Sequence, residues 1–374
     1  MSVCYQINFQ RNLGGGEIFT RSFSRALAAL GWDSVLLVAR GARYWTELKP
    51  QVREIIEIDS EDELDDRLPR DDLVITHTAL SEHAARRLSG THRLCGFAHM
   101  PLYDREPRGL AHYRCVIGVS QHVLDSAGAR GLTKLYPEPV YGAADLTPRG
   151  AALPVAARSP YDWDSRKFRD RLLRRLESLL PSAFVSGEPF QRSGVLTLAV
   201  VSRLTPIKQF PAMFAILAPI LQRHSEVRLE IFGAGGYASV RDLRRALRPC
   251  AKQVRFWGTQ PDVASVYRQV DYVLSGLPEK EALGLNLIEA EAIGTPVLAV
   301  RKPPFIETVL EGETGYLFRD PRDDGGADFE RLLKKIREPN ARPQPQRAAQ
   351  FLERFSERAF ALRVERLLEA LKAC

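Results

Sequence analysis

Short apolar segments alternate with longer helix-like stretches along most of this chain, and this alternation limits the fold more than any other feature. Strands that are each followed by a helix normally pair in the same direction, so the pattern predicts a parallel, doubly wound α/β sheet. The pattern occurs twice, which predicts two such sheets. The expected strands of the first half lie at residues 3–8, 34–39, 73–77, 93–99 and 115–120. Those of the second half lie at residues 196–202, 228–233, 254–258, 271–275, 296–300 and 315–318.

Residues 146–195 separate the two halves and are rich in proline, glycine and serine at both ends, as expected of a linker. A length of 374 residues also suits two domains. We therefore predict an N-terminal α/β domain over residues 1–188 and a C-terminal α/β domain over 189–354. An amphipathic C-terminal helix over 355–374 is expected to pack back toward the N-terminal domain.

The composition argues against several classes of protein. No apolar run approaches the length of a membrane span, and the first ten residues are too polar for a signal peptide. The five cysteines are scattered and show no CxxC spacing, which indicates neither a disulfide framework nor a zinc site. These features predict a cytoplasmic protein.

The net charge of +7 is unevenly distributed, because residues 54–72 carry ten acidic residues against two arginines. The more basic remainder suits phosphates or an anionic membrane surface, or serves solubility alone. Segment 163–180 is typical of a helix with leucines on one face and arginines on the other, which can lie on an anionic inner-membrane surface. A solvated helix packed on its own domain is the alternative. We predict no nucleic-acid partner.

The stretch from Glu279 to Val300 is the strongest functional signal. Glu281 is expected in a loop, and Glu289 about two turns inside a helix that begins near Leu285. The first N–H groups of such a helix favour an anion such as a diphosphate, and a nearby carboxylate accepts hydrogen bonds from hydroxyl groups. A diphosphate and a polyol together are the chemistry of a nucleotide-sugar.

Two cations follow the first strand of the second half. Arg203 and Lys208 stand in the loop that leaves this strand. Ligands of doubly wound sheets bind at the carboxyl ends of the strands. The two side chains would neutralise a diphosphate and stabilise it as a leaving group. The alternative is a pair of ordinary surface cations.

Two further strands end in glycine-containing turns. The segment EIFGAGG contains Gly233 but lacks the dinucleotide-binding spacing. The segment FWGTQ contains Trp257, Gly258 and Gln260, and a nucleobase is expected to rest on its backbone. Trp257 is alternatively a residue of the core.

The first half has its own candidate contacts. The segment LGGGE, with Gly15 and Gly16, lets the backbone approach a phosphate or a sugar closely, and a simple turn is the alternative. His77 and His99 each end an expected strand, and both are expected to face the cleft between the domains. A structural role is the alternative for either histidine.

These segments together resemble the retaining glycosyltransferases of family four. That family has the GT-B fold, in which two Rossmann-like domains have parallel sheets facing across a cleft. EALGLNLIEA is similar to the family's Glu-x7-Glu motif, and SRLTPIK is similar to its strand and loop with Arg and Lys. The GGGE loop, YGAAD (141–145) and PFIETVLEGETGYLF (304–318) are similar to further segments of the family. The likeness is close over 190–320 and looser over 1–150.

The resemblance implies roles for individual residues. Glu281 would hold hydroxyl groups of the transferred sugar, and Glu289 would hold the ribose. The implied catalytic residues are Glu281, His99, Arg203 and Lys208. The implied donor-binding residues are Gly15, Gly16, Arg203, Lys208, Gly233, Trp257, Gly258, Leu283, Gly284, Leu285, Asn286 and Glu289. The family's retaining, front-face substitution generally uses neither a metal nor another cofactor, because the helix dipole and the cations do that work.

The chain departs from the family at four places. Leu283 replaces a phenylalanine, and Ser202 and Gln209 replace glycines. Lys-Pro-Pro at 302–304 replaces a glycine pair, which leaves the backbone contacts to the sugar open. All the charged residues are kept.

The resemblance implies a hexosyl transferase that uses a nucleotide-diphosphate sugar as co-substrate. The acceptor would be a glycan or a lipid-linked sugar of bacterial surface polysaccharide or lipopolysaccharide biosynthesis. Another GT-B enzyme, such as a nucleotide-sugar epimerase, is the first alternative. A non-catalytic, glycosyltransferase-like binding subunit is the second.

Overall fold

The computed structural model falls into two compact units, Met1–Asp145 with Glu353–Cys374, and Leu146–Leu352. The described residues are 3–11, 14–144, 154–163, 168, 170–172, 175, 188–192 and 194–373. Asp145 and most of segment 163–180 lie outside them, so the basic amphipathic helix remains a prediction, as do the domain bounds. None of the helices in the described ranges combines the length and the hydropathy that a membrane span requires.

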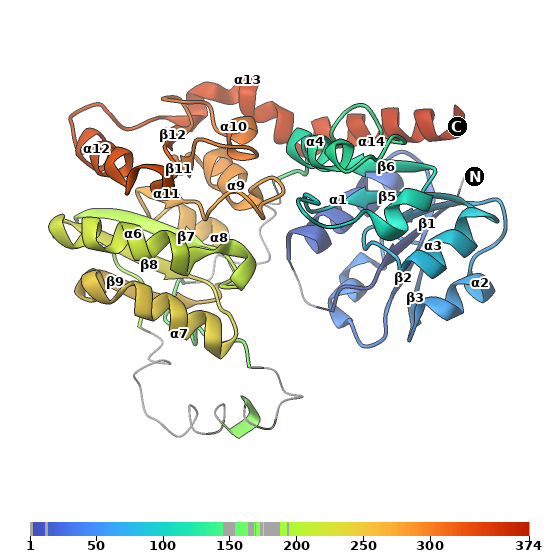
Figure 1. Ribbon diagram of the computed structural model, residues 1–374, viewed down its shortest axis with the longest axis horizontal. Coiled ribbons are helices and arrows are strands. Elements are labelled where there is room, and N and C mark those ends of the chain that lie inside the picture. Colours follow the sequence, from blue (N-terminus) through green and yellow to red (C-terminus); the bar gives the residue numbers. More distant parts are fainter. Residues whose placement is uncertain are drawn as a thin grey trace. The chain divides into compact units, whose positions relative to one another are not determined.

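The first unit is built on a six-stranded parallel sheet with the order β3-β2-β1-β4-β5-β6 (Figure 1). Its strands are β1 (Val3–Asn8), β2 (Asp33–Ala39), β3 (Glu54–Ile58), β4 (Leu73–Thr76), β5 (Arg93–Ala98) and β6 (Cys115–Gly118). Its α-helices are α1 (Gly15–Ala29), α2 (Leu64–Arg67), α3 (Glu82–Ser89), α4 (Gln121–Ala129) and α14 (Glu357–Ala373). Its 3-10 turns are η1 (Arg43–Leu48), η2 (Glu61–Glu63), η3 (Arg108–His112) and η7 (Glu353–Phe355).

Five of these strands lie where the apolar segments predict them. The central strand β4 is buried along its whole length, as expected of a parallel sheet that is covered on both faces. The prediction missed β3, which pairs only with β2 at the sheet edge and carries glutamates among its isoleucines. An edge strand tolerates such charges, which conceal it in a sequence dominated by acidic residues.

The C-terminal helix packs on the N-terminal sheet unit, as predicted. The Phe360 ring of α14 lies 5.2 Å from the Phe19 ring of α1, edge to face. Arg25 of α1 and Glu357 of α14 form an ion pair at 3.7 Å. The apolar face of α14 is therefore buried against a helix more than 300 positions earlier in the sequence.

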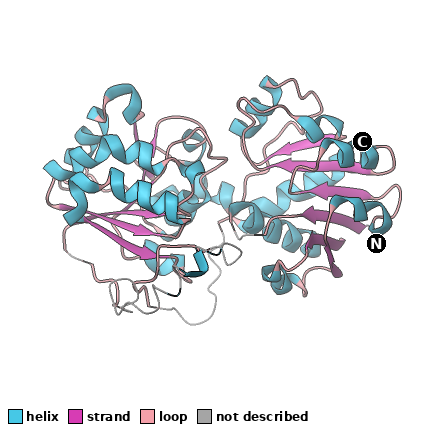
Figure 2. Cartoon of the chain, turned by 60° about the horizontal axis from the view of Figure 1, so that its bottom comes forward, coloured by secondary structure: helices cyan, strands magenta, loops and turns pink. Residues whose placement is uncertain are grey.

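The second unit repeats the same topology, with the strand order β12-β11-β10-β7-β8-β9 and parallel pairing throughout. Figure 2 shows the strands in magenta with cyan helices beside them. Its strands are β7 (Leu196–Val201), β8 (Val227–Phe232), β9 (Val254–Gly258), β10 (Tyr272–Leu274), β11 (Val297–Val300) and β12 (Gly315–Phe318). Its α-helices are α6 (Phe210–Arg223), α7 (Tyr237–Ala246), α8 (Val263–Tyr267), α9 (Leu285–Ile293), α10 (Phe305–Thr308), α11 (Pro321–Asp324), α12 (Ala327–Lys335) and α13 (Ala349–Leu352). Its 3-10 turns are η4 (Pro206–Lys208), η5 (Arg248–Gln253) and η6 (Pro345–Ala348).

The core of the second unit lies between its sheet and the surrounding helices. Helix α6 is the most apolar of them and buries a broad face, made of Phe210, Met213, Phe214, Leu217, Ala218, Ile220 and Leu221. Strand β11, with the sequence VLAV, is wholly buried, in keeping with its place inside a parallel sheet. This packing holds the strand ends, and thus the loops that follow them, in fixed positions.

Candidate functional site

The strand order of the second unit determines where a ligand can bind. Strands β7 and β10 are neighbours, and the chain leaves them toward opposite sides of the sheet. Doubly wound sheets bind ligands at such a switch point, outside the carboxyl ends of the strands. Lys208 follows β7 and Glu281 follows β10, so both predicted side chains belong to this point.

Lys208 and Glu281 form an ion pair across the switch point. Only 24% of the lysine side chain and 15% of the glutamate side chain are exposed. The second carboxylate oxygen of Glu281 accepts a hydrogen bond from the N–H of Ala282 at 3.2 Å, which fixes the carboxylate against its own loop. The arrangement brings a cation and a carboxylate together, and these are side-chain types suited to a phosphate and to hydroxyl groups respectively.

Helix α9 begins directly beyond this pair. Gly284 is its N-cap residue and has φ 86°, in the left-handed region that suits glycine. No side chain caps this end, and no described residue accepts a hydrogen bond from the N–H of Gly284, Leu285 or Asn286. The Asn286 side chain instead donates to the carbonyl oxygen of Val201 at 3.1 Å, which ties α9 to the end of β7. The helix thus presents unused N–H groups, the usual means of binding an anion.

Glu289 lies closer to the start of α9 than expected, and its side chain is buried. It is the fifth residue of α9, about one turn inside the helix, so the expectation of two turns is wrong. Its side chain is buried, and it accepts a hydrogen bond from the hydroxyl group of Tyr267 at 3.0 Å. Burial, and then the charge of Glu289, raise the pKa of Tyr267 well above its usual value. The role of Glu289 toward a ribose remains a prediction.

Arg203 is exposed, and no described residue forms an ion pair with it. The glycine turn after β8 packs directly on its loop. A Cβ atom at Gly233 would meet the carbonyl oxygen of Ser202 at 1.9 Å, and one at Gly235 would meet that of Leu204 at 2.0 Å. These glycines therefore let the turn pack closely on the Arg203 loop, a role that differs from the predicted donor contact of Gly233.

Trp257 is a residue of the core. Its side chain is buried, and its indole N–H donates to Glu230 at 2.7 Å. The ring therefore offers little surface to a nucleobase, and the core alternative describes it better.

The two other residues of this strand end contact segment 154–163. Gly258 has φ 67° and lies against the carbonyl oxygen of Ser159. The side chain of Gln260 is hydrogen-bonded to the backbone of Ala156. At this strand end the described contacts hold segment 154–163.

In the first unit, His99 faces the start of α1. A Cβ atom at Gly16 would lie 3.9 Å from the His99 ring, and Gly15 is the first residue of the helix. Burial lowers the pKa of His99 to about 4, so the imidazole is neutral near pH 7. Its Nε2 atom is buried and has no hydrogen-bond partner among the described residues, and its role toward a sugar remains a prediction.

His77 is more buried, and its Nε2 atom lies 3.1 Å from the side-chain oxygen of Gln6. Its ring is stacked on that of Phe97. Burial lowers the pKa of His77 well below its usual value, and the neighbouring His99 contributes. These contacts favour the structural alternative for His77.

A charged network that was not predicted from the sequence supports the Glu281 loop. Asp320 follows β12 and is fully buried, and it accepts hydrogen bonds from Lys302 at 2.9 Å and from Arg322 Nε at 2.9 Å. Arg322 also pairs with Glu279, two residues before Glu281. The charged segment FRDPRDD is the only sequence signal for the network, and it does not identify the partners.

The two doubly wound units define the class: this is a protein of the GT-B fold. The solved structure of Anabaena Alr3699/HepE in complex with UDP-glucose aligns with a TM-score of 0.73 over 99% of this chain and all of that one, at 17% identity. At this identity the similarity shows the fold alone.

Residues 188–350 match the family described as "Glycosyl transferases group 1", a region that contains the whole Lys208–Glu281 site. D-inositol 3-phosphate glycosyltransferase of Corynebacterium efficiens is 33% identical over 129 residues, which are 32% of this chain and 30% of that protein. Phosphatidyl-myo-inositol mannosyltransferase of Mycobacterium tuberculosis is 31% identical over 151 residues, 40% of this chain and 39% of that protein. The chain thus aligns with roughly a third of the length of these relatives.

Proposed function

We propose that this protein is a retaining glycosyltransferase that moves a hexose-type sugar from a nucleotide-diphosphate sugar to an acceptor. The observation that carries the proposal is the Lys208–Glu281 pair at the switch point, directly before the uncapped start of α9. The unused N–H groups and the cations receive the diphosphate, and Glu281 receives the sugar hydroxyl groups. The match of residues 188–350 to glycosyl transferases supports this reading.

Charge on the departing diphosphate is stabilised by Arg203, Lys208 and the α9 dipole. These groups perform the task for which other transferases use a metal ion, so the reaction needs no metal or other cofactor. His99, neutral and with an unused buried nitrogen, contacts the sugar near the reacting carbon. The donor phosphate assists deprotonation of the acceptor in a front-face substitution.

The acceptor we propose is a glycan or a lipid-linked sugar of bacterial surface polysaccharide or lipopolysaccharide synthesis. The mannosyltransferase from Mycobacterium tuberculosis is named for a lipid acceptor, phosphatidyl-myo-inositol, which supports a lipid-linked substrate here. Segment 163–180 would then bring the cytoplasmic enzyme to the anionic inner-membrane surface.

Screening nucleotide-sugars for thermal stabilisation tests donor binding, because a ligand that binds only the folded form raises the melting temperature. The stabilising donor is then incubated with acceptor extracts, and NMR reports the anomeric configuration of the product. Retention of configuration, with activity unchanged by a chelator, is expected. An inverted product contradicts the retaining assignment.

The same assay separates the two alternatives. Release of a free epimer without any acceptor would identify a nucleotide-sugar epimerase. Donor-induced stabilisation without turnover on any acceptor extract would identify a binding subunit. Glu281, Arg203 and Lys208 are all present, which favours the enzyme.

A further inference from the structure

A charged hollow lies at the edge of the C-terminal sheet opposite to the Lys208–Glu281 site. Its volume is about 650 Å³, and its walls include the first residues of β7 and β10. Because parallel strands begin at one edge and end at the other, this hollow is separate from the Lys208–Glu281 site at the carboxyl ends. Three arginines are among the residues that line it, Arg192, Arg337 and Arg342.

Two of these arginines share one carboxylate oxygen. Arg192 and Arg342 both donate a hydrogen bond to Oδ1 of Asp271. The distance from the Arg342 guanidinium nitrogen to this oxygen is 3.0 Å. The other oxygen, Oδ2, accepts the backbone N–H of Thr197 at 2.9 Å, so the 9% exposed carboxylate is fully engaged. The arginine side chains themselves remain 52% and 45% exposed. Each guanidinium has five N–H donors, so most of them face the hollow or solvent.

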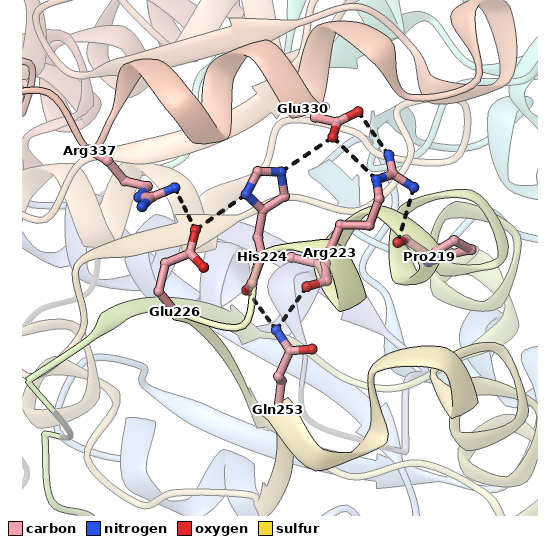
Figure 3. Close-up of polar contacts among 8 residues, drawn as sticks. Pro219, Arg223, His224, Glu226, Gln253, Glu330 and Arg337 are labelled. Atoms are coloured by element: carbon pink, nitrogen blue, oxygen red, sulfur yellow. Dashed lines mark hydrogen bonds and ion pairs between the residues drawn. The ribbon is translucent and has the colours of Figure 1, made fainter.

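The third arginine is held by a chain of polar contacts (Figure 3). Arg337 pairs with Glu226 at 2.5 Å, and Glu226 lies 3.3 Å from Nδ1 of His224. The other ring nitrogen of His224 lies 3.4 Å from Glu330, which also pairs with Arg223 at 2.8 Å. The contacts connect α6, α12 and the start of β8, so the guanidinium is positioned before any ligand arrives.

We propose that this hollow binds a phosphate-bearing small molecule. Three guanidinium groups face two carboxylates there, Asp271 and Glu226, which leaves an excess of positive charge. Planar guanidinium groups bind phosphate through paired hydrogen bonds, and prior positioning lowers the cost of binding. The hollow also has the volume of a small-molecule site, about 300–1,000 Å³. This inference does not depend on the proposed glycosyltransferase activity.

Calorimetric titration with inorganic pyrophosphate tests the site in the full-length chain. Arg203→Ala/Lys208→Ala serves as the background, because it weakens the donor site. Pyrophosphate is expected to bind this variant, and adding Arg337→Gln and Arg342→Gln is expected to weaken binding by about tenfold or more, the scale of charged hydrogen bonds. The matched control is Arg331→Gln, a 70% exposed arginine of α12 that does not line the hollow.

No measurable binding to the background variant overturns the proposal. Equal binding with and without the two glutamine substitutions overturns it as well. If circular dichroism shows that the glutamine variant is unfolded, Arg337→Lys and Arg342→Lys replace it, since lysine keeps the charge and loses the planar fork. An unchanged affinity in both lysine variants refutes the site, and a reduced affinity supports it.

Discussion

Glu281 lies beside both a cation and a helix start with unused N–H groups. Its carboxylate pairs with the cation of Lys208, and its backbone leads within three residues to the open start of α9. A bound donor would exchange part of this ion pair for hydrogen bonds from sugar hydroxyl groups. Since the pair is partly exposed, its loss leaves Lys208 in contact with water.

Replacing Glu281 by alanine is expected to abolish transfer while the fold survives. Removing a preorganised group at a reacting centre lowers turnover by about 10²–10³-fold. The fold is expected to survive because the substitution leaves no buried charge unpaired. Turnover by Glu281→Ala is compared with that of Glu313→Ala, an exposed glutamate of the same unit. Full activity of Glu281→Ala would refute the site.

Arg203 is expected to contribute to donor binding without contributing to stability. It is exposed and has no ion pair among the described residues, so Arg203→Ala should leave the melting temperature unchanged. We expect it to weaken binding of the nucleoside diphosphate by about 1.5–3 kcal/mol, the scale of a hydrogen bond to a charged group. Calorimetry measures both variants, with the exposed Arg241→Ala as the control. An unchanged affinity contradicts the assignment.

At the scale of elements, the loops after β10, β11 and β12 act together. One network of ion pairs connects these three loops. Asp320, after β12, pairs with Lys302, which follows β11. Arg322, also after β12, pairs with Asp320 and with Glu279, which follows β10. The positive partners lower the pKa of Asp320, chiefly through hydrogen bonds from Arg322. The network holds the loop that carries Glu281.

Removing Arg322 is expected to loosen this loop. Arg322→Ala should raise the KM for the donor and lower kcat by several-fold to about tenfold, because a small displacement of a positioning loop weakens transition-state contacts. Arg322→Lys should restore part of the loss. The control is Arg319→Ala, an exposed arginine of the same segment. Kinetics that match the control would show that the network is only structural.

At the scale of the whole molecule, one buried acid opposes stability. Glu291 of α9 is fully buried. The hydroxyl group of the nearby Thr314 also accepts a hydrogen bond from the backbone N–H of Leu310 at 2.8 Å. Burial raises the pKa of Glu291 well above its ordinary value of 4.5, and the Thr314 hydroxyl group opposes this rise only in part.

This raised pKa gives stability a defined pH dependence. The folded unit retains the proton and the unfolded chain releases it above pH 4.5, so the contribution of Glu291 to stability falls as the pH rises from there. Relative to wild type, Glu291→Gln should gain stability toward neutral pH, by at most about 1.4 kcal/mol per pH unit. Calorimetry between pH 5 and 8 measures the difference, with Glu313→Gln as the control. A difference that does not change with pH contradicts the assignment.

Much of this protein follows from local patterns in its sequence. Apolar segments of the right length predicted eleven of the twelve strands found among the described residues, because buried parallel strands need continuous apolar side chains. The sequence also predicted the start of α9 at Leu285 and the charged residues around it. A glycine followed by the onset of helical periodicity marks the N-terminal end of a helix.

Other features depend on which segments meet in space. The edge strand β3 is stabilised by pairing with β2, which its acidic sequence does not reveal. Trp257 resembles a ligand contact at a strand end, yet the side chains around it place it in the core. The partners of Arg322, Asp271 and His224 lie up to 106 positions away, and only folding brings them together. Local sequence determines where strands and helices form, whereas long-range packing decides which polar groups are buried, paired or left open to a ligand.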